Sequence, residues 1–186
     1  MRNLLLILVL LGTAAVLFSC SGDRGRESRP QSTANLTPAG NSAVSVEGID
    51  EAGLKQLIER RGGRMLFLNV WATWCVPCVE EFPDIVKLSR SYDSKRLEVV
   101  AISADYPDEV DSKIIPFLMK QNVPFKVYVA KFEDQEKFIN ALDTAWSGGL
   151  PATFIYDTEG HRRFRLVGQG SYERFKQQID KLREKQ

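Results

Sequence analysis

The run MLFLNVWA, from Met65 to Ala72, constrains the fold of this chain more than any other segment. It has the length of a β-strand, and its apolar residues are continuous rather than alternating with polar ones. A strand of this kind is covered on both faces, which is typical of the inner strands of α/β proteins. LEVVAISA, from Leu97 to Ala104, has the same character. The two runs therefore predict a sheet that is buried between layers of helices.

The remaining patterns of residues 44–186 alternate between helix and strand. The first helix is expected to carry Ile49, Leu54, Leu57 and Ile58 on one face. Further elements are predicted as helices at 75–91, 109–121 (bent at Pro116), 136–142 and 172–185, a strand at 123–130, and an antiparallel pair at 152–157 and 161–167. Strands that alternate with helices and end in a hairpin and a helix predict an α/β fold with a mixed sheet.

The N-terminus has the pattern of an export signal. Arg2 precedes 15 uncharged residues, from Leu4 to Phe18. As a helix this run would span only about 22 Å, against roughly 30 Å for the hydrocarbon core of a bilayer. A positive end followed by a short apolar run and small residues indicates a signal peptide over residues 1–19, with an uncleaved anchor as the alternative.

Cys20 follows the apolar run directly, in the sequence LFSC. This stretch resembles the lipobox of bacterial lipoproteins, in which the cysteine is acylated and becomes the first residue of the mature chain. The alternative is a cysteine that is removed with the signal. Residues 20–43 are rich in Ser, Gly, Pro and Arg and nearly free of large apolar residues. We therefore expect a flexible tether there and a folded domain over residues 44–186.

The charge pattern excludes nucleic acid as a partner. The formal net charge is +1, and the 25 Lys and Arg residues are interspersed with 24 Asp and Glu residues, so they form no basic stripe. The segment HRRFR, from His161 to Arg165, is expected to be a solvated strand and turn. With 44% apolar residues, the chain can build an ordinary core for one domain, and we expect a monomer.

WATWCVPC, from Trp71 to Cys78, places two cysteines between the first buried strand and a helix. Structural zinc takes about four ligands, and beyond Cys75 and Cys78 the expected domain offers only His161 among the usual soft ligands. Attached c-type haem needs a histidine directly after the second cysteine, where this chain has Val79. We therefore expect no metal and no cofactor. A structural disulfide and a redox-active pair remain as alternatives.

The position of the pair favours redox chemistry. A disulfide that closes so small a loop constrains the unfolded chain little, so it would add little stability. At the start of a helix, Cys75 faces free N–H groups and the positive end of the helix dipole, and both lower the pKa of a thiol. The interpretation that follows is a dithiol that exchanges electrons with other disulfides.

On these residues the chain resembles the thioredoxin superfamily over most of residues 44–186. WCVPC matches the WCxxC active site, which implies that Cys75 attacks a substrate disulfide and that Cys78 resolves the intermediate. GGLPATF matches the loop of the family's cis-proline. The resemblance thus implies a cis bond between Leu150 and Pro151, and pairing of the Leu150 backbone with a substrate peptide. An ordinary turn proline is the alternative.

The closer resemblance is to the membrane-tethered, extracytoplasmic branch typified by TlpA, ResA and the cytochrome c maturation thioredoxins. It implies a mixed central sheet flanked by helices, with an extra strand-helix insertion before the cis-proline, here at about residues 97–130. Thioredoxin itself has a buried aspartate where this chain has Asn69, which cannot titrate. Glu81 matches the branch's active-site glutamate and is the implied general base for Cys78. An exposed helix glutamate is the alternative for Glu81, and Glu80 is its rival.

The residues around the pair indicate the direction of electron flow. Lowering the pKa of a thiol from about 8.5 to about 7 takes about 2 kcal/mol, whereas the value of about 3.5 in DsbA takes roughly 7 kcal/mol and further positive groups. Val76 and Pro77 offer no donor side chain, and Glu80 and Glu81 oppose thiolate formation. We expect a modestly lowered pKa of Cys75 and a reducing pair.

The resemblance also implies partners and a location. Oxidised exported proteins, apocytochrome c among them, are the implied targets, and a membrane thiol carrier of the DsbD or CcdA kind is the implied electron donor. With the export signal and a lipid anchor, the domain is expected outside the cytoplasm on a bacterial membrane, facing the periplasm in a diderm. Trp71, Trp74 and Trp146 are candidates for the docking surface, with core packing as the alternative for each.

Three other functions compete with disulfide reduction. A DsbA-like oxidase would use the same residues with a higher reduction potential. A peroxiredoxin would have the pattern PxxxTxxC, which is not matched, because Thr73 lies only two residues before Cys75. A tethered, non-catalytic binding module on the same fold is the third alternative.

Overall fold

The structure is a computed structural model, and it describes residues 44–184. The expected signal peptide (1–19), the tether (20–43) and the lipidation of Cys20 lie outside the described residues. Within 44–184, none of the helices combines the length and the apolar character that crossing a bilayer would require.

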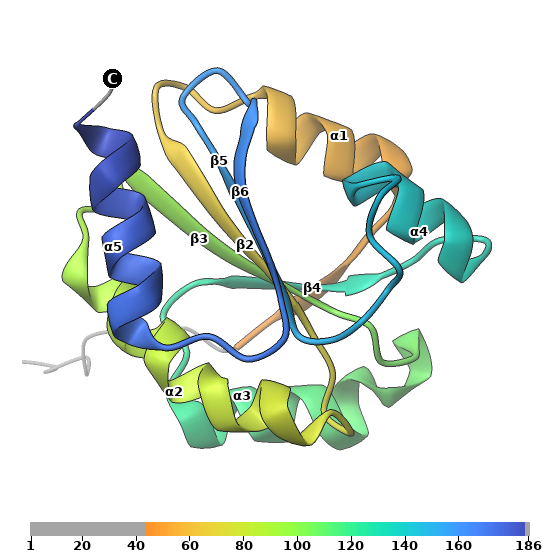
Figure 1. Cartoon of the computed structure of the whole chain (residues 1–186). Helices are drawn as coiled ribbons and strands as arrows, with labels where there is room; N and C mark the ends of the chain where they lie inside the picture. Colours follow the sequence, from red (N-terminus) through yellow and green to blue (C-terminus); the bar gives the residue numbers. More distant parts are fainter. Residues whose placement is uncertain (1–43, 185–186) are drawn as a thin grey trace, which may run out of the picture. The chain divides into compact units, whose positions relative to one another are not determined.

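A single six-stranded mixed sheet forms the centre of the domain (Figure 1). Its strands lie in the order β1-β4-β3-β2-β5-β6. The first four of these are mutually parallel, while β5 is antiparallel to both β2 and β6. The strands are β1 (Val46–Ile49), β2 (Met65–Trp71), β3 (Leu97–Ser103), β4 (Lys126–Ala130), β5 (Ala152–Tyr156) and β6 (Arg162–Val167).

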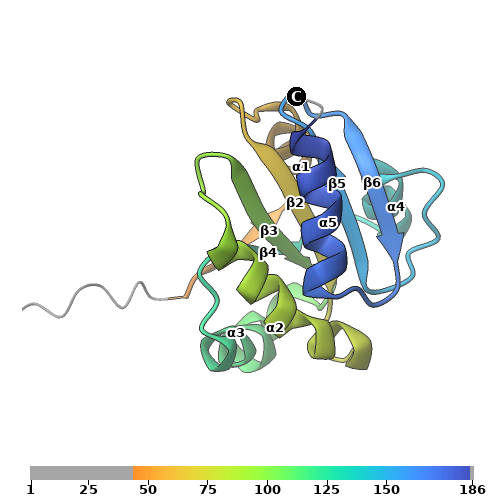
Figure 2. The ribbon, with the colours of Figure 1, turned by 60° about the vertical axis from the view of Figure 1, so that its left-hand side comes forward.

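Helices cover both faces of this sheet (Figures 1 and 2). On one face α1 and α4 pack side by side, and on the other face α2 contacts both α3 and α5. The helices are α1 (Glu51–Glu59), α2 (Val76–Ser91), α3 (Ile115–Gln121), α4 (Gln135–Leu142) and α5 (Tyr172–Arg183). The predicted α/β fold with a mixed sheet flanked by helices is therefore confirmed.

Strand β2 lies in the middle of the sheet, and all seven of its residues are buried. Because successive side chains of a strand point to opposite faces, Leu66, Leu68 and Val70 belong to the core beneath α1 and α4. Phe67 packs edge-on against Phe175 of α5 on the other face. The continuous apolar run thus reflects burial on both sides, as the sequence predicted.

Two sequence-based assignments were wrong in detail. Ile49 lies in strand β1, not in the first helix, because Asp50 caps α1 by accepting the Gly53 N–H at 2.8 Å and so sets the helix start after it. The helix expected at 109–121 is divided into a 3₁₀ turn (η1, Pro107–Glu109), a π-helical turn (η2, Val110–Ile114) and α3. Pro116 has no N–H to continue the ladder, so the bend expected there takes the form of a π turn before it.

The register between β2 and β5 brings two distant segments together. Val70 pairs with Ala152 in this antiparallel ladder. The last residues of β2 therefore lie next to the loop that precedes β5 and contains Pro151. The loop after β2 carries the cysteine pair, so the fold places Pro151 and the cysteines at the same edge of the sheet.

Close packing before α5 gives a test of this architecture. A Cβ on Gly170 would overlap the ring of Phe175, which is fully buried. We expect Gly170→Ala to lower the free energy of unfolding by about 1–3 kcal/mol, since a buried aromatic ring must shift. Urea unfolding of the oxidised protein measures this change.

Gly48→Ala is the matched control, because its Cβ would meet only the flexible side chain of Lys131. We expect it to change the free energy of unfolding by less than about 1 kcal/mol. Equal stability of the two variants would contradict the packing described for Gly170.

Candidate active site

The cysteine pair lies where strand β2 gives way to helix α2. Cys75 is the N-cap residue of α2, and the Cys75 and Cys78 Sγ atoms are joined in a disulfide at 2.00 Å. Pro77 lies in the first turn of the helix, where a missing N–H costs nothing. Cys75 is 6% exposed and Cys78 is fully buried. The outer sulfur is therefore the one that a partner can approach, as the predicted order of attack requires.

Leu150, in the loop before β5, packs against the hydrophobic cluster that contains both cysteines. The Leu150–Pro151 peptide bond is cis, as predicted. Pro151 is buried, and its carbonyl accepts the Gly168 N–H at 2.8 Å. Leu150 is half-buried, and its own N–H and C=O form no hydrogen bond with any residue from 44 to 184. This backbone is therefore available to pair with an incoming strand.

Glu81 lies one turn after Cys78 on α2 and is only 1% exposed. Its Oε1 accepts a hydrogen bond from Asn69 Nδ2 at 2.9 Å, and its Oε2 accepts the Gly170 N–H at 2.7 Å. Asn69 Nδ2 also donates to Thr153 Oγ1 at 3.1 Å. The alternative of an exposed helix glutamate is wrong for Glu81 and fits its neighbour Glu80, which is exposed.

Burial sets the protonation of Glu81. Removal from solvent raises its pKa from 4.5 to about 7, although the hydrogen bonds from Gly170 and Asn69 act in the opposite direction. Nearby Asp84 raises the pKa further. A carboxyl group with a pKa near neutrality can both take up and release a proton at physiological pH.

Sequence reasoning named Asn69 but missed its role as the partner of Glu81, and it missed Thr153 and Gly170 entirely. The signal that could have found Thr153 is its position two residues after Pro151, directly opposite Asn69 in the ladder between β2 and β5. Gly170 carries no such signal, because a backbone N–H contributes to a site without leaving a trace in the residue type.

A groove of about 600 Å³, lined by both aromatic and charged residues, begins at Trp74, the residue before Cys75. Trp74 is 63% exposed at one wall and Tyr106 is 73% exposed, so two large aromatic side chains stand open to solvent here. Of the three tryptophans considered for docking, Trp71 is fully buried against Phe82 and is a core residue. The groove is lined by residues that include Trp74, Tyr106, Pro107, Phe132, Trp146 and Leu150.

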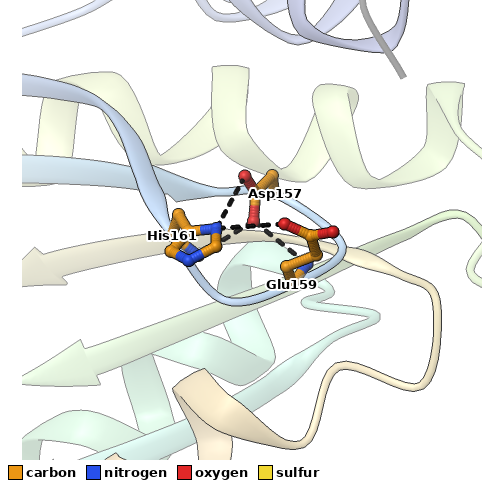
Figure 3. A group of neighbouring side chains, drawn as sticks. All are labelled: Asp157, Glu159 and His161. Carbon is orange, nitrogen blue, oxygen red and sulfur yellow. Dashed lines mark hydrogen bonds and ion pairs between the residues drawn. The ribbon is translucent and has the colours of Figure 1, made fainter.

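Asp157, Glu159 and His161 form a second cluster of polar side chains, at the turn between β5 and β6 (Figure 3). Asp157 Oδ1 accepts the N–H groups of Glu159 and His161, and its Oδ2 accepts Arg163 Nε at 2.6 Å. Burial alone would raise the pKa of Asp157, but these hydrogen bonds hold it below the usual value. The cluster is a hydrogen-bonded turn at the far end of β5 from Pro151, and it does not belong to the site.

The fold and the site together define a class of protein. A disulfide between a central strand and the helix after it, facing a cis-proline before an antiparallel strand, is the arrangement of thioredoxin-like dithiol proteins. A crystal structure of a thiol:disulfide interchange protein of the thioredoxin family from Chlorobium tepidum TLS has this fold. It matches with a TM-score of 0.56 at 24% identity, over 66% of this chain and 82% of that one.

Sequence comparison agrees with the fold. The model of the AhpC/TSA family matches residues 39–164, and the chain belongs to this family. It is 28% identical over 143 residues to Thiol-disulfide oxidoreductase ResA of Bacillus thuringiensis (strain Al Hakam), covering 77% of this chain and 78% of that protein. It is 30% identical over 129 residues to Thioredoxin-like protein YneN of Bacillus subtilis (strain 168), covering 69% and 71%. With the Cys75–Cys78 disulfide, these similarities identify the chain as a thiol-disulfide oxidoreductase.

The raised pKa of Glu81 predicts how stability depends on pH. Between pH 4.5 and about 7 the unfolded chain gives up the Glu81 proton before the folded protein does. The free energy of unfolding therefore falls across this window, by about 3 kcal/mol in total, and the contribution is constant above it. We expect Glu81→Gln to remove most of this fall, as measured by urea unfolding of the oxidised protein at pH 5, 6, 7 and 8.

Glu80→Gln is the control, because Glu80 is exposed on the same helix. It should retain the wild-type slope between pH 5 and pH 7. A Glu81→Gln variant with that same slope would show that Glu81 does not titrate as its burial requires.

Proposed function

We propose that this protein reduces disulfide bonds in exported proteins, outside the cytoplasm, through its Cys75–Cys78 dithiol. The observation that carries the proposal is the buried Glu81, which lies one turn from the buried Cys78 and has a pKa of about 7. It gives the second cysteine a proton acceptor where water cannot reach. Cys75, Cys78 and Glu81 are the catalytic residues of this mechanism.

In the first step, the Cys75 thiolate attacks one sulfur of a substrate disulfide. A bond forms between Cys75 Sγ and that sulfur, the substrate S–S bond breaks, and the other substrate sulfur leaves as a thiolate that takes a proton from solvent. The position of Cys75 at the N-cap of α2 favours its thiolate, because free N–H groups and the helix dipole lie there.

In the second step, Cys78 attacks Cys75 Sγ. Glu81 accepts the proton of the Cys78 thiol, the mixed disulfide breaks, and the second substrate sulfur leaves with a proton. Two electrons have then passed to the substrate, and the Cys75–Cys78 disulfide is the oxidised product. A dithiol donor must reduce this disulfide again, and a membrane thiol carrier of the DsbD or CcdA kind has the required chemistry.

The surroundings of the pair support the reducing direction. A strongly stabilised thiolate makes the reduced form stable and the pair oxidising. Here Val76 and Pro77, the residues between the cysteines, have no polar side-chain donor. The thiolate therefore depends on the helix terminus for its stabilisation, which is a modest source.

Substrate would bind as an extended segment across Leu150. The N–H and C=O of Leu150, which have no hydrogen-bond partner among residues 44–184, would pair with the backbone of that segment. The buried Pro151 holds the loop next to the end of β6 through its bond from the Gly168 N–H. The groove at Trp74 would then take an apolar side chain next to the substrate cysteine, against the aromatic residues in its wall, Trp74, Phe132 and Trp146. Trp74, Leu150 and Pro151 are the substrate-binding residues of the proposal.

The location and the natural targets rest on the N-terminal sequence and on the family resemblance. The export signal and the lipobox-like Cys20 support a domain tethered to a bacterial membrane by a lipid anchor. Exported proteins with oxidised cysteine pairs, apocytochrome c among them, are the proposed substrates. The dithiol acts without a cofactor and as a monomer in this mechanism.

Trapping of the mixed disulfide tests the proposal. Cys78→Ser in the full-length chain should accumulate covalent complexes with exported proteins, because the second step is blocked. Capture of cytoplasmic proteins alone would contradict the proposed location and substrate class.

Glu81→Gln with both cysteines present should slow the resolution of the mixed disulfide about 100-fold at pH 7, which is the typical effect of losing a general base. Stopped-flow or quenched gel analysis with an oxidised peptide measures this rate. Glu80→Gln should resolve the complex at the wild-type rate. Unchanged resolution in Glu81→Gln would remove Glu81 from the mechanism.

A further inference from the structure

A second buried carboxylate lies behind the cysteine loop. Asp105 comes two residues after the end of β3 and is 3% exposed. Its Oδ2 accepts the Thr73 N–H at 2.9 Å, and its Oδ1 accepts the Thr73 hydroxyl at 2.6 Å. The Ser103 hydroxyl donates to Oδ2 at 2.5 Å and accepts the Asp105 N–H at 3.0 Å. The mechanism proposed above does not use this group.

These bonds fix the loop that carries the outer cysteine. Thr73 precedes Cys75 by two residues, so their Cα atoms are at most about 8 Å apart. The Trp71 carbonyl accepts the Ala104 N–H at 2.8 Å, and the Ala72 carbonyl accepts the Cys75 N–H at 3.2 Å in a turn that contains Thr73. The segment from Trp71 to Cys75 is thus tied to the end of β3, and Asp105 supplies both side-chain bonds of that tie.

The charge of Asp105 is held by neutral donors. Thr73 and Ser103 provide all three hydrogen bonds that the Asp105 carboxylate accepts within residues 44–184, and no Lys, Arg or His in this range forms an ion pair with it. Lys113 lies within electrostatic reach, but it is half exposed and paired with Glu109. Solvent and salt screen a buried charge weakly. The Asp105 carboxylate bonds Thr73, two residues before Cys75, and the residue is only 3% exposed, so its negative charge is weakly screened from the cysteine loop.

We propose that Asp105 is a positioning residue that holds the Thr73–Cys75 turn and, through its buried negative charge, lowers the reduction potential of the Cys75–Cys78 pair. The reduced form carries a thiol that ionises to a thiolate, whereas the disulfide carries no charge. A nearby carboxylate disfavours the thiolate, so it destabilises the reduced form relative to the disulfide. The inference deepens the proposed function, because it names a group that makes the dithiol a stronger reductant.

Three variants of the full-length protein separate charge from loop geometry. Asp105→Asn keeps the shape of the side chain and removes its charge. It should raise the equilibrium constant for reduction by glutathione at pH 7 about tenfold, which is a shift of about 30 mV for this two-electron couple. Thr73→Val and Ser103→Ala remove one hydroxyl donor each and leave the charge of Asp105 in place. We expect both to leave the constant unchanged or to lower it.

The signs of these shifts decide the inference. If Asp105→Asn leaves the equilibrium constant for reduction unchanged, the inference is wrong. It is also wrong if Thr73→Val or Ser103→Ala raises this constant as much as Asp105→Asn does, because loosening of the loop would then explain all three variants. If Asp105→Asn does not fold, as judged by far-UV circular dichroism, an increase in either hydroxyl variant still contradicts the charge effect. These differences between variants do not depend on the absolute potential of the wild-type protein, which tests the proposed function separately.

Discussion

The side chain of Glu81 joins the four segments that meet behind the disulfide. Its two oxygens accept hydrogen bonds from Asn69 on β2 and from the backbone before α5, and Asn69 connects in turn to Thr153 on β5. A carboxyl group in this place is costly to ionise, and its pKa rises to about 7 for that reason. The same cost makes the group useful, because it can accept a proton from a neighbouring buried thiol.

The fold supplies the two conditions that this chemistry needs. Central strand β2 is buried on both faces. The loop after its C-terminal end carries Cys75 near the surface, while Cys78 and Glu81 on α2 are buried. The antiparallel pairing of β2 with β5 then sets the Pro151 loop against the same edge. Cys75 thus lies near the surface, close to the groove and to the Leu150 backbone, which forms no hydrogen bond within residues 44–184, whereas Cys78 is fully buried.

The sequence was sufficient for the parts of the site that depend on local patterns. The apolar run of β2 and the position of Cys75 and Cys78 at a helix start each have a local physical signature, whereas the cis bond before Pro151 was implied by the family resemblance. The structure confirms all three. The sequence left open whether Glu80 or Glu81 is the buried glutamate, because this depends on which face of α2 packs against α5. The boundary at Ile49 was wrong, since an apolar residue directly before a helix cap fits either a strand end or a helix face.

The contacts of Asp105 and Gly170 could not have been predicted in the same way. Both link segments that are far apart in the chain, the first to Thr73 over 32 positions and the second to Glu81 over 89. Such pairs depend on the order of strands in the sheet, which local patterns do not determine. These contacts affect the pKa of Glu81 and the proposed reduction potential of the cysteine pair, but they do not determine that the pair exists. The sequence therefore indicates the class of protein, whereas these properties require the structure.

The reduction potential of the Cys75–Cys78 pair in the wild-type protein decides whether this dithiol reduces or forms disulfides in other proteins. Equilibration with a series of thiol–disulfide buffers at pH 7, followed by alkylation and mass measurement of the reduced fraction, gives this value. A reducing pair should have a potential in the range of thioredoxin, at about −270 mV. A value near that of DsbA, about −120 mV, would contradict it, because the pair would then make disulfides rather than break them.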